Sequence, residues 1–353
     1  ELSARLGNQA VFMDVTVDPA LLILKRHASG RSVDPTLLVW ADYASGSFDQ
    51  VLRALRRHEV PRLPSCLEDH GNFSIYSVPS LQSAKDWVTR PFASANVLSA
   101  MSDSQLVGHR FSVQQGTITG LNAAFLLDNA GYRALPKHEQ QFFRPAVVND
   151  TIKNGQIIPG MWVFFPYGEG VPTITSETDL KKRLPVYFQT KLNPYKEALI
   201  QRARITEAGW WRLSEHRNWQ VAWRPKIIST YFGQAGSFAL DRVGDLVVVQ
   251  GYGWQPKREG LTEQHLVAIV ATLNAPITNT LLAGVSNNLS GGQWNLSKRF
   301  VERMPLIDAQ KLPDSLLEPL THIGEQMAKG EPWDPVALDH LARKALRISM
   351  HVS

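Results

Sequence analysis

The sequence predicts an α+β fold in which a mixed, β-rich region carries helical insertions and precedes a helical tail. Short runs of β-branched and aromatic residues, many of them bounded by glycine or proline, dominate residues 108–254. Apolar residues recur at helical spacing in 47–58 and 262–288. The stretch 314–348 is mostly helical in pattern, with a turn at Lys329–Pro335.

Length and changes in residue composition along the chain indicate how it divides into parts. A chain of 353 residues is long enough for two domains or three. The proline-rich passage VPRLPS, 60–65, is typical of a boundary or linker, and the texture changes again at Gly108. The expected parts are residues 1–60, a connector at 61–107, a central domain at 108–308 and a tail at 309–353.

In residues 1–60 the sequence predicts three short strands and a helix. The stretch VFMDVTVDPALLILKRH, 11–27, indicates a strand, a break at Asp18-Pro19 and a buried strand, Leu21–Leu24. A third strand is expected at 37–43. The helix is expected at 47–58, where the first residue is a serine suited to an N-cap.

The central part alternates between strands and helices. Strands are expected at 161–167, 224–233 and 245–254. The chain is expected to become helical after Pro194. An apolar helix is expected at 262–288, with a break at Asn274-Ala275-Pro276 because proline cannot continue the hydrogen-bond ladder.

Positive charge is concentrated in one segment. The net charge of the chain is +5, and between Lys181 and Lys226 eleven Lys or Arg face only three Glu, a local net charge of +8. The same segment holds four tryptophans, Trp210, Trp211, Trp219 and Trp223. Basic residues interleaved with aromatic ones suit a polyanion with stackable faces, which favours a nucleic acid. A solvated helix flank with core tryptophans is an equally open interpretation.

Several kinds of chemistry are not indicated by the sequence. There is no GxxxxGK[ST] phosphate loop, no HExxH metal site and no GxSxG nucleophile motif. Asn193-Pro194-Tyr195 is interpreted as the start of a helix, and Glu68-Asp69-His70 as surface charge rather than an acid–base pair. We therefore expect no catalytic, cofactor-binding or metal-binding residue in this chain.

Cysteine usage and apolar runs narrow the class of protein further. The single cysteine, Cys66, excludes an internal disulfide and a CxxC zinc site, and is expected to be a small buried hydrophobe. No run of 18 apolar residues appears, so we expect no membrane span. No charged-then-apolar leader opens the chain, so a cytoplasmic location is expected.

The stretch SGGQWN, 290–295, is the first candidate for contact with a nucleic acid, which the family resemblance described below implies to be DNA. Gly291 and Gly292 would allow close approach of the backbone, while Ser290, Gln293 and Asn295 offer hydrogen bonds. Lys298 and Arg299, just beyond it, would hold phosphates. The alternative is a tight turn in which Trp294 packs on the core.

Two further glycine-containing loops are candidates, and each has a structural alternative. The first contains Gly116, Thr117, Gly120 and Asn122; it either meets DNA or simply turns the chain. The second, 251–254, is a glycine-framed aromatic hairpin tip, for which a structural turn is preferred. The remaining DNA-contact candidates are Tyr252, Trp254, Arg224 and Lys226.

The order of several stretches resembles a known family, the adenine-N6 DNA methyltransferases with a TaqI-like specificity domain. VFMDVTVDPALLILKRH is similar to the last strands of their Rossmann-like catalytic fold. The stretches FSVQQGTITGLNAAFLLD, FFRPAVVNDTIKNG with MWVFFPY, and LNPYKEALIQRAR with WWRL are similar to passages of their target-recognition part. So are RPKIISTYFGQAGSFALD and ATLNAPITNTLLAGVSNNLSGGQWNLSKRFVERMPL, although LNAP stands where the family has LNS.

The resemblance covers roughly 11–307 and implies a division of labour. Residues 1–60 would be the end of a catalytic domain, and 108–308 would be a target-recognition domain that binds double-stranded DNA. The family's catalytic tetrapeptide, Asn or Asp followed by Pro-Pro and an aromatic residue, is not in the sequence, and neither is its glycine-rich loop for S-adenosylmethionine. Those motifs would lie before Glu1, in a missing N-terminal catalytic domain.

The resemblance further implies the setting of the protein. It would belong to a restriction-modification or phage-defence system, and S-adenosylmethionine would be the cofactor of the parent enzyme, whereas this chain alone would be inactive. The helical tail, 309–353, would pack on its own domain or on a protein partner. The rival hypothesis is a non-enzymatic nucleic-acid-binding module or the specificity subunit of a restriction complex, which would explain the basic segment equally well.

Overall fold

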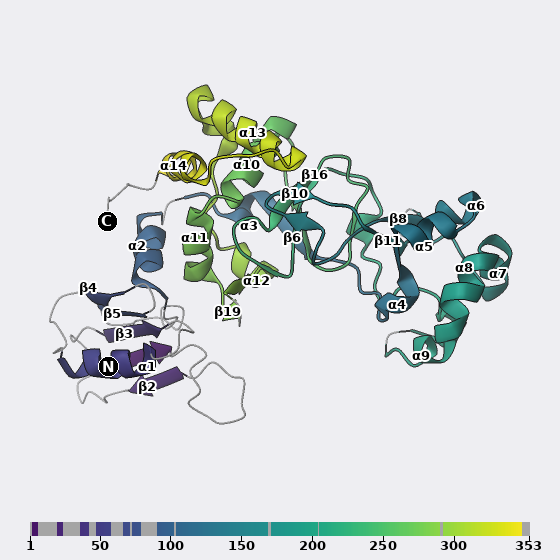
Figure 1. Ribbon diagram of the computed structural model, residues 1–353, viewed down its shortest axis with the longest axis horizontal. Coiled ribbons are helices and arrows are strands. Elements are labelled where there is room, and N and C mark those ends of the chain that lie inside the picture. The colour runs from purple at the N-terminus through teal and green to yellow at the C-terminus, as the bar shows by residue number, and fades with distance from the viewer. Residues whose placement is uncertain are drawn as a thin grey trace. The chain divides into compact units, whose positions relative to one another are not determined.

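The computed structural model divides into two compact units, Glu1–Ser102 with Thr280–Gln293, and Asp103–Asn279 with Trp294–Ser353 (Figure 1). We call them unit 1 and unit 2. The fold is α+β, as predicted. The structure describes residues 2–5, 20–23, 36–41, 47–57, 66–70, 73–78, 90–101, 104–168, 171–203, 205–289 and 292–347.

Unit 1 is built on a five-stranded sheet with the order β2-β1-β3-β5-β4. Strands β1 and β3 are parallel, and the other neighbours are antiparallel. The bounds are β1 Leu2–Arg5, β2 Ala20–Ile23, β3 Thr36–Ala41, β4 Cys66–Asp69 and β5 Phe73–Val78. The strands expected at 21–24 and 37–43 are therefore present, whereas the one expected at 11–17 lies outside the described residues.

Helices accompany this sheet. Helix α1, Ser47–Arg57, occupies the predicted range, and its Val51 and Ala54 pack against Val39 and Ile75. Burial of this apolar face fixes the helix on the sheet. Helix α2, Phe92–Ala100, follows in the chain. Cys66 is exposed on β4, so the expectation of a buried cysteine is wrong: it lies on a strand whose described side chains are only partly covered.

Unit 2 contains two four-stranded sheets. The first has the order β16-β14-β18-β6 and is antiparallel throughout. The second has the order β17-β8-β11-β7, with β17 and β8 parallel. Their bounds are β6 Phe111–Gln115, β14 Lys226–Ser229, β16 Phe238–Asp241, β18 Tyr252–Pro256, β7 Leu126–Asp128, β8 Phe143–Val147, β11 Met161–Phe164 and β17 Val247–Val248.

A series of short helices covers the second sheet. Residues 181–226, which we call the basic segment, form some of these helices. Phe125, Phe164, Tyr187, Trp210 and Trp211 are buried in one core with it. Trp210 and Trp211 are thus core tryptophans, so the basic segment is not one continuous binding surface. The bounds are α4 Asn122–Phe125, α5 Asn129–Ala134, α6 Lys137–Gln140, α7 Glu177–Arg183, α8 Pro185–Tyr187, a π-helical turn Phe188–Leu192 and α9 Lys196–Ile200.

The first sheet of unit 2 is accompanied by longer helices (Figure 1). Helix α10, Glu263–Leu273, packs closely on α13, Asp314–Lys329: a Cβ on Gly324 would lie 2.6 Å from Val267 Cγ1. Helix α14 is Pro335–Ala345. The two tail helices match the predicted range, and α13 packs on its own unit.

The predicted break in the apolar helix is also present. Helix α10 and helix α11, Ile277–Val285, are bent by 78° at the break around Pro276. Within the described ranges, no single helix is long and apolar enough to cross a membrane, and only this bent pair passes such a test jointly. Further elements are α3 Val107–Arg110, β9 Ile152–Lys153, β10 Gln156–Ile157, β12 Tyr167–Gly168, β13 Val171–Pro172, β15 Phe232–Gly233, β19 Asn288–Leu289, β20 Gln293–Asn295 and α12 Lys298–Val301.

Candidate nucleic-acid interface

An open groove of about 560 Å³ lies in unit 2 beside strands β6 and β18. Segments that are far apart in the sequence meet there: β6, β18, the single turn Asn218–Gln220 and the start of α12. We call it the basic groove. It is lined by Val113, Gln114, Gln115, Arg217, Trp219, Tyr252, Ser297, Lys298 and Arg299.

The groove carries positive charge. Arg217, Lys298 and Arg299 line it, and no Asp or Glu is among its described lining residues. Arg217 Nη1 lies 2.6 Å from Glu215 Oε2, and Lys298 Nζ lies 4.0 Å from Glu302 Oε1. The Arg299 guanidinium stacks on the ring of Phe300 and forms no ion pair with any described residue. The surplus of positive charge suits a polyanion.

Arg217 occupies an unusual backbone conformation. Its φ is +59°, in the left-handed region that a residue with a side chain rarely adopts. Its Nε donates to the Gly116 carbonyl at 3.3 Å, and its side chain also contacts Gln115 Oε1. Such strain is maintained only when the surroundings fix the residue, and it is common where a side chain must be presented to a ligand.

Two aromatic side chains complete the groove. The Trp219 ring packs on Gly253, where a Cβ would lie 2.3 Å from the ring, so a larger residue at 253 would displace it. Trp219 Nε1 donates to the Gln115 carbonyl at 3.3 Å. Burial raises the pKa of Tyr252 further above neutral, and its protonated hydroxyl is able to donate. These rings and hydroxyls suit sugars, bases or phosphates.

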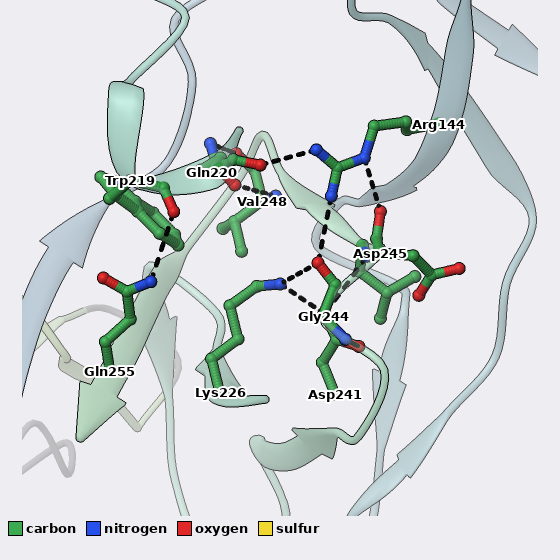
Figure 2. Close-up of polar contacts among 10 residues, drawn as sticks. Arg144, Trp219, Gln220, Lys226, Asp241, Gly244, Asp245, Val248 and Gln255 are labelled. Carbon is green, nitrogen blue, oxygen red and sulfur yellow. Dashed lines mark hydrogen bonds and ion pairs between the residues drawn. The ribbon is translucent and has the colours of Figure 1, made fainter. Parts of the chain in front are cut away.

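A buried glutamine, Gln220, holds in place the turn that follows Arg217, and Figure 2 shows its contact with Val248. Gln220 Nε2 donates to Thr117 Oγ1 at 2.7 Å and to the Val248 carbonyl at 3.0 Å, while Gln220 Oε1 accepts from Val248 N at 2.6 Å. Because this amide is fully satisfied in the interior, its neighbour Trp219 is fixed at the surface. Thr117 is buried in this network, so it offers no surface for DNA and has a structural role instead.

A second buried network contains Lys226 (Figure 2). Its Nζ lies 2.5 Å from Asp241 Oδ2 and donates to the Gly244 carbonyl at 3.1 Å. Burial lowers the pKa of Lys226, and the Asp241 carboxylate opposes that shift. Arg144 donates to the carbonyls of Gln220, Gly244 and Asp245. Lys226 thus ties the 241–245 loop to β14 and is enclosed, which leaves no surface for the DNA contact predicted from the sequence.

Other predicted contacts lie away from the groove. Trp254 is fully buried, and its Nε1 donates to Ser229 Oγ at 3.1 Å, so it belongs to the core. Gly120 has a φ of +78° in a turn against Arg202, and the exposed Asn122 accepts from Thr119 Oγ1 at 2.6 Å. Neither Gly120 nor Asn122 lines the basic groove.

The 251–254 stretch divides between a turn and a strand. Gly251 has a φ of +145° and sits against the Ser229 carbonyl, whereas Tyr252 begins strand β18. The side chain of Tyr252 lines the groove, as do those of Lys298 and Arg299. Gly116 borders it through the carbonyl that accepts from Arg217, and its own Cα is packed against Val248.

The SGGQWN stretch is described only from Gly292 onward; Ser290 and Gly291 lie outside the described residues. Gly292 has a φ of +75° with open space around it, and Gln293 is exposed. Trp294 and Asn295 are half-buried on β20, where they pair with Gly233 and Phe232 of β15. The tryptophan is therefore neither a core residue nor a fully exposed one, and neither of the two interpretations is decided.

Arg224 lies in a different depression. A groove of about 590 Å³, which we call the second groove, is lined by residues that include Arg224, Arg242, Gln255, Lys257 and Arg258. Arg242 is paired with Glu263 and with Glu325, the latter at 2.7 Å. Arg224 and Arg258 are exposed and form no ion pair with any residue in the described ranges.

Sequence reasoning missed six residues of the basic groove as individual contacts: Val113, Gln114, Gln115, Arg217, Trp219 and Ser297. Arg217 and Trp219 belong to the basic, tryptophan-rich segment, so a signal was present, but it did not separate them from the buried Trp210 and Trp211. Across the part of the chain that the structure describes, no three His, Cys, Asp or Glu side chains gather as a metal site would require.

Unit 1 contains a charged group around Glu68. Glu68 carboxylate oxygens lie 3.0 Å from Arg57 Nη2 and 2.9 Å from His70 Nε2. Arg57 and His70 side chains are both more than half exposed. His70 therefore lies at the surface as interpreted, whereas the Glu68 side chain is only 11% exposed and the side chain of Asp69 is outside the described ones.

Comparison with known proteins gives structural likeness alone, since no family model and no curated protein matches the chain. The chain is similar to the Type IIL restriction-modification enzyme MmeI, solved in complex with DNA, with a TM-score of 0.51 and 9% identity, over 90% of this chain and 48% of that one. For the type IIG restriction endonuclease BpuSI the TM-score is 0.44 and the identity 7%, over 98% and 44%. The chain thus spans about half the length of these structures, and at these values only the first likeness indicates a shared fold.

Proposed function

We propose that this chain binds double-stranded DNA through the basic groove and selects a sequence for a restriction-modification enzyme. The observation that carries the proposal is the groove itself: Arg217, Lys298 and Arg299 meet there with Trp219 and Tyr252, and no carboxylate lines it. Cations would hold phosphates, while amide, hydroxyl and aromatic groups would contact sugars and base edges.

The fold likeness supports the same proposal. A solved structure that shares the fold is a restriction-modification enzyme in complex with DNA, and this chain corresponds to about half of it. The parent enzyme would transfer a methyl group from S-adenosylmethionine to adenine N6, after the base has been rotated out of the duplex. This chain would supply duplex affinity and sequence choice, and it would act in the cytoplasm.

A non-enzymatic nucleic-acid-binding module or a specificity subunit remains the second candidate. The basic groove would serve such a protein equally well, because stacking platforms and phosphate clamps also suit single strands and RNA. A module for single strands or RNA differs from a methyltransferase recognition domain in the preferred nucleic acid: the recognition domain requires a DNA duplex, whose major groove admits side chains, whereas the major groove of duplex RNA is too narrow. A specificity subunit would share the preference for duplex DNA.

A competition experiment tests the proposed function. A fluorescent DNA duplex bound by the chain is titrated with unlabelled duplex DNA, single-stranded DNA and duplex RNA of the same sequence. We expect duplex DNA to compete at the lowest concentration, because the groove would have to engage base edges of B-form DNA. The matched control is Lys182→Ala, an exposed lysine of α7, which should leave the ranking unchanged. Equal or stronger competition by RNA or by the single strand would contradict the proposal.

A further inference from the structure

A pair of glutamine side chains joins the basic groove to the second groove. Gln114 Nε2 donates to Gln255 Oε1 at 3.1 Å. Gln114 lines the basic groove, and Gln255 lines the second one. Both side chains are half-buried and project from neighbouring strands, β6 and β18, where Gln114 is in register with Gly253.

Positive charge lies on both sides of this pair. Arg217, Lys298 and Arg299 line the basic groove, and Arg224, Lys257 and Arg258 line the second groove together with Glu259 and the Arg242–Glu263 pair. Tyr252 is the first residue of strand β18, and Lys257 follows it five residues later. In an extended strand this separation corresponds to about 16 Å, at about 3.3 Å per residue. That span equals the axial length of about five base pairs of duplex.

The amide of Gln114 is held in one orientation. Its partner Gln255 is itself anchored, because Gln255 Nε2 donates to the Trp219 carbonyl at 3.3 Å (Figure 2). Trp219 is fixed in turn by the buried Gln220 beside it. Fixing an amide before a ligand arrives reduces the entropy lost on binding and gives the side chain a defined direction.

The unused hydrogen-bonding groups of Gln114 form a donor–acceptor pair. One Nε2 hydrogen is taken by Gln255, so one hydrogen and the Oε1 lone pairs have no partner among the described residues. A donor beside an acceptor matches the major-groove edge of adenine, which presents N7 as an acceptor and the N6 amino group as a donor. The same pair does not match guanine, which presents two acceptors there.

From this juxtaposition, we propose that Gln114, oriented by Gln255, is a specificity-determining residue that reads an adenine of an A·T pair, while the cations of the two grooves hold the flanking phosphates. This inference rests on the proposed function, since it requires a duplex in the basic groove. It assigns sequence choice to β6 and β18 rather than to the SGGQWN loop.

Binding-site selection from a randomised DNA duplex pool tests the inference on the full chain. The selected sequences for the unaltered chain are compared with those for Gln114→Ala, Gln255→Ala and Gln141→Ala. Gln141 is a matched control, because it is an exposed glutamine whose amide donates to the His138 carbonyl, and it lines neither groove. Melting temperature and affinity for unselected duplex are measured on the same samples.

We expect the unaltered chain and Gln141→Ala to select the same sequence, with an A·T pair at one position. Gln114→Ala should lower the preference at that position by about 5- to 150-fold, the equivalent of one lost base contact, while keeping its melting temperature. Gln255→Ala should relax the same position to a smaller extent, because it removes the anchor and leaves the reading amide.

The outcomes separate this inference from the proposed function. If Gln114→Ala selects the same sequence with the same strength, or if the position that relaxes is not an A·T pair, the inference is overturned and duplex binding stands. If the unaltered chain binds duplex without selecting any sequence, base reading is excluded altogether. If the chain does not bind duplex at all, both the inference and the proposed function are overturned.

Discussion

Lys226 and Lys298 carry the same side chain in opposite environments. Lys226 is in register with Asp241 across β14 and β16, and both side chains are almost completely buried. Lys298 is exposed at the mouth of the basic groove. Both lysines stand near basic and aromatic residues in the sequence, and no neighbouring residue indicates which of them is buried. The ion-pair partner of Lys226, Asp241, lies fifteen residues away and reaches it only through the pairing of two strands. At the residue scale, the sequence can therefore indicate which side chains are candidates for DNA contact, but it cannot indicate whether those side chains are exposed.

Lys226→Ala is expected to affect stability. The change leaves the Asp241 carboxylate buried without its partner, which should lower the free energy of unfolding by about 3–5 kcal/mol. Urea unfolding measures this loss. Lys298→Ala is the matched comparison: it should change stability by less than about 0.5 kcal/mol and weaken binding of every duplex alike. Wild-type stability combined with weaker DNA binding in Lys226→Ala would show that its assignment as a structural residue is wrong.

At the scale of elements, the helix ends marked by proline or glycine were predicted from the sequence. The ion pairs that the charged side chains of the helices form were not. The break before α11 follows from Pro276, which cannot donate to the hydrogen-bond ladder of a helix, and the turn after α13 follows from Gly330, whose left-handed φ of +71° ends that helix. In the basic segment, Lys181 and Lys196 were counted toward polyanion binding. The structure instead brings both to Glu177, which joins α7 to α9 and to Trp210.

The Glu177 cluster predicts a specific dependence of stability on pH. Hydrogen bonds from Lys181 and Trp210, followed by Lys196, lower the pKa of Glu177 to about 2 from its ordinary 4.5. A carboxyl whose folded-state pKa is depressed stabilises the fold above its unfolded pKa and loses that contribution as the pH falls toward the folded value. Glu177→Gln should therefore be less stable than the unaltered chain above pH 4.5, and the difference should shrink between pH 4.5 and 2.

Denaturant unfolding at several pH values measures that difference. Glu207→Gln is a suitable control, because Glu207 is exposed and forms no ion pair with any described residue of the chain. Its stability should follow that of the unaltered chain across the whole range. If the difference caused by Glu177→Gln does not change with pH, the carboxylate does not hold the cluster by its charge.

At the scale of the whole molecule, the sequence predicted the α+β class and the order of most elements, but not the site that the fold assembles. The basic groove takes its residues from four places, 113–115, 217–219, 252 and 297–299, so it exists only through the pairing of β6 with β18 and the packing of two short turns beside them. Local patterns carry no record of such long-range contacts. The SGGQWN loop drew attention because its composition is unusual, whereas Gln114 and Arg217 have ordinary neighbours.

The central claim is that duplex DNA binds in the basic groove through its cations. The most direct measurement is the slope of log K for duplex binding against log salt concentration, for the chain and for a variant with Arg217→Gln, Lys298→Gln and Arg299→Gln. Each phosphate contact contributes a slope of about 0.9, so the variant should bind more weakly with a slope shallower by about three units. A control with Lys137→Gln, Lys182→Gln and Lys329→Gln, three exposed lysines outside the groove, should keep the original slope. A groove variant that keeps its melting temperature and binds with unchanged affinity and slope would contradict the claim.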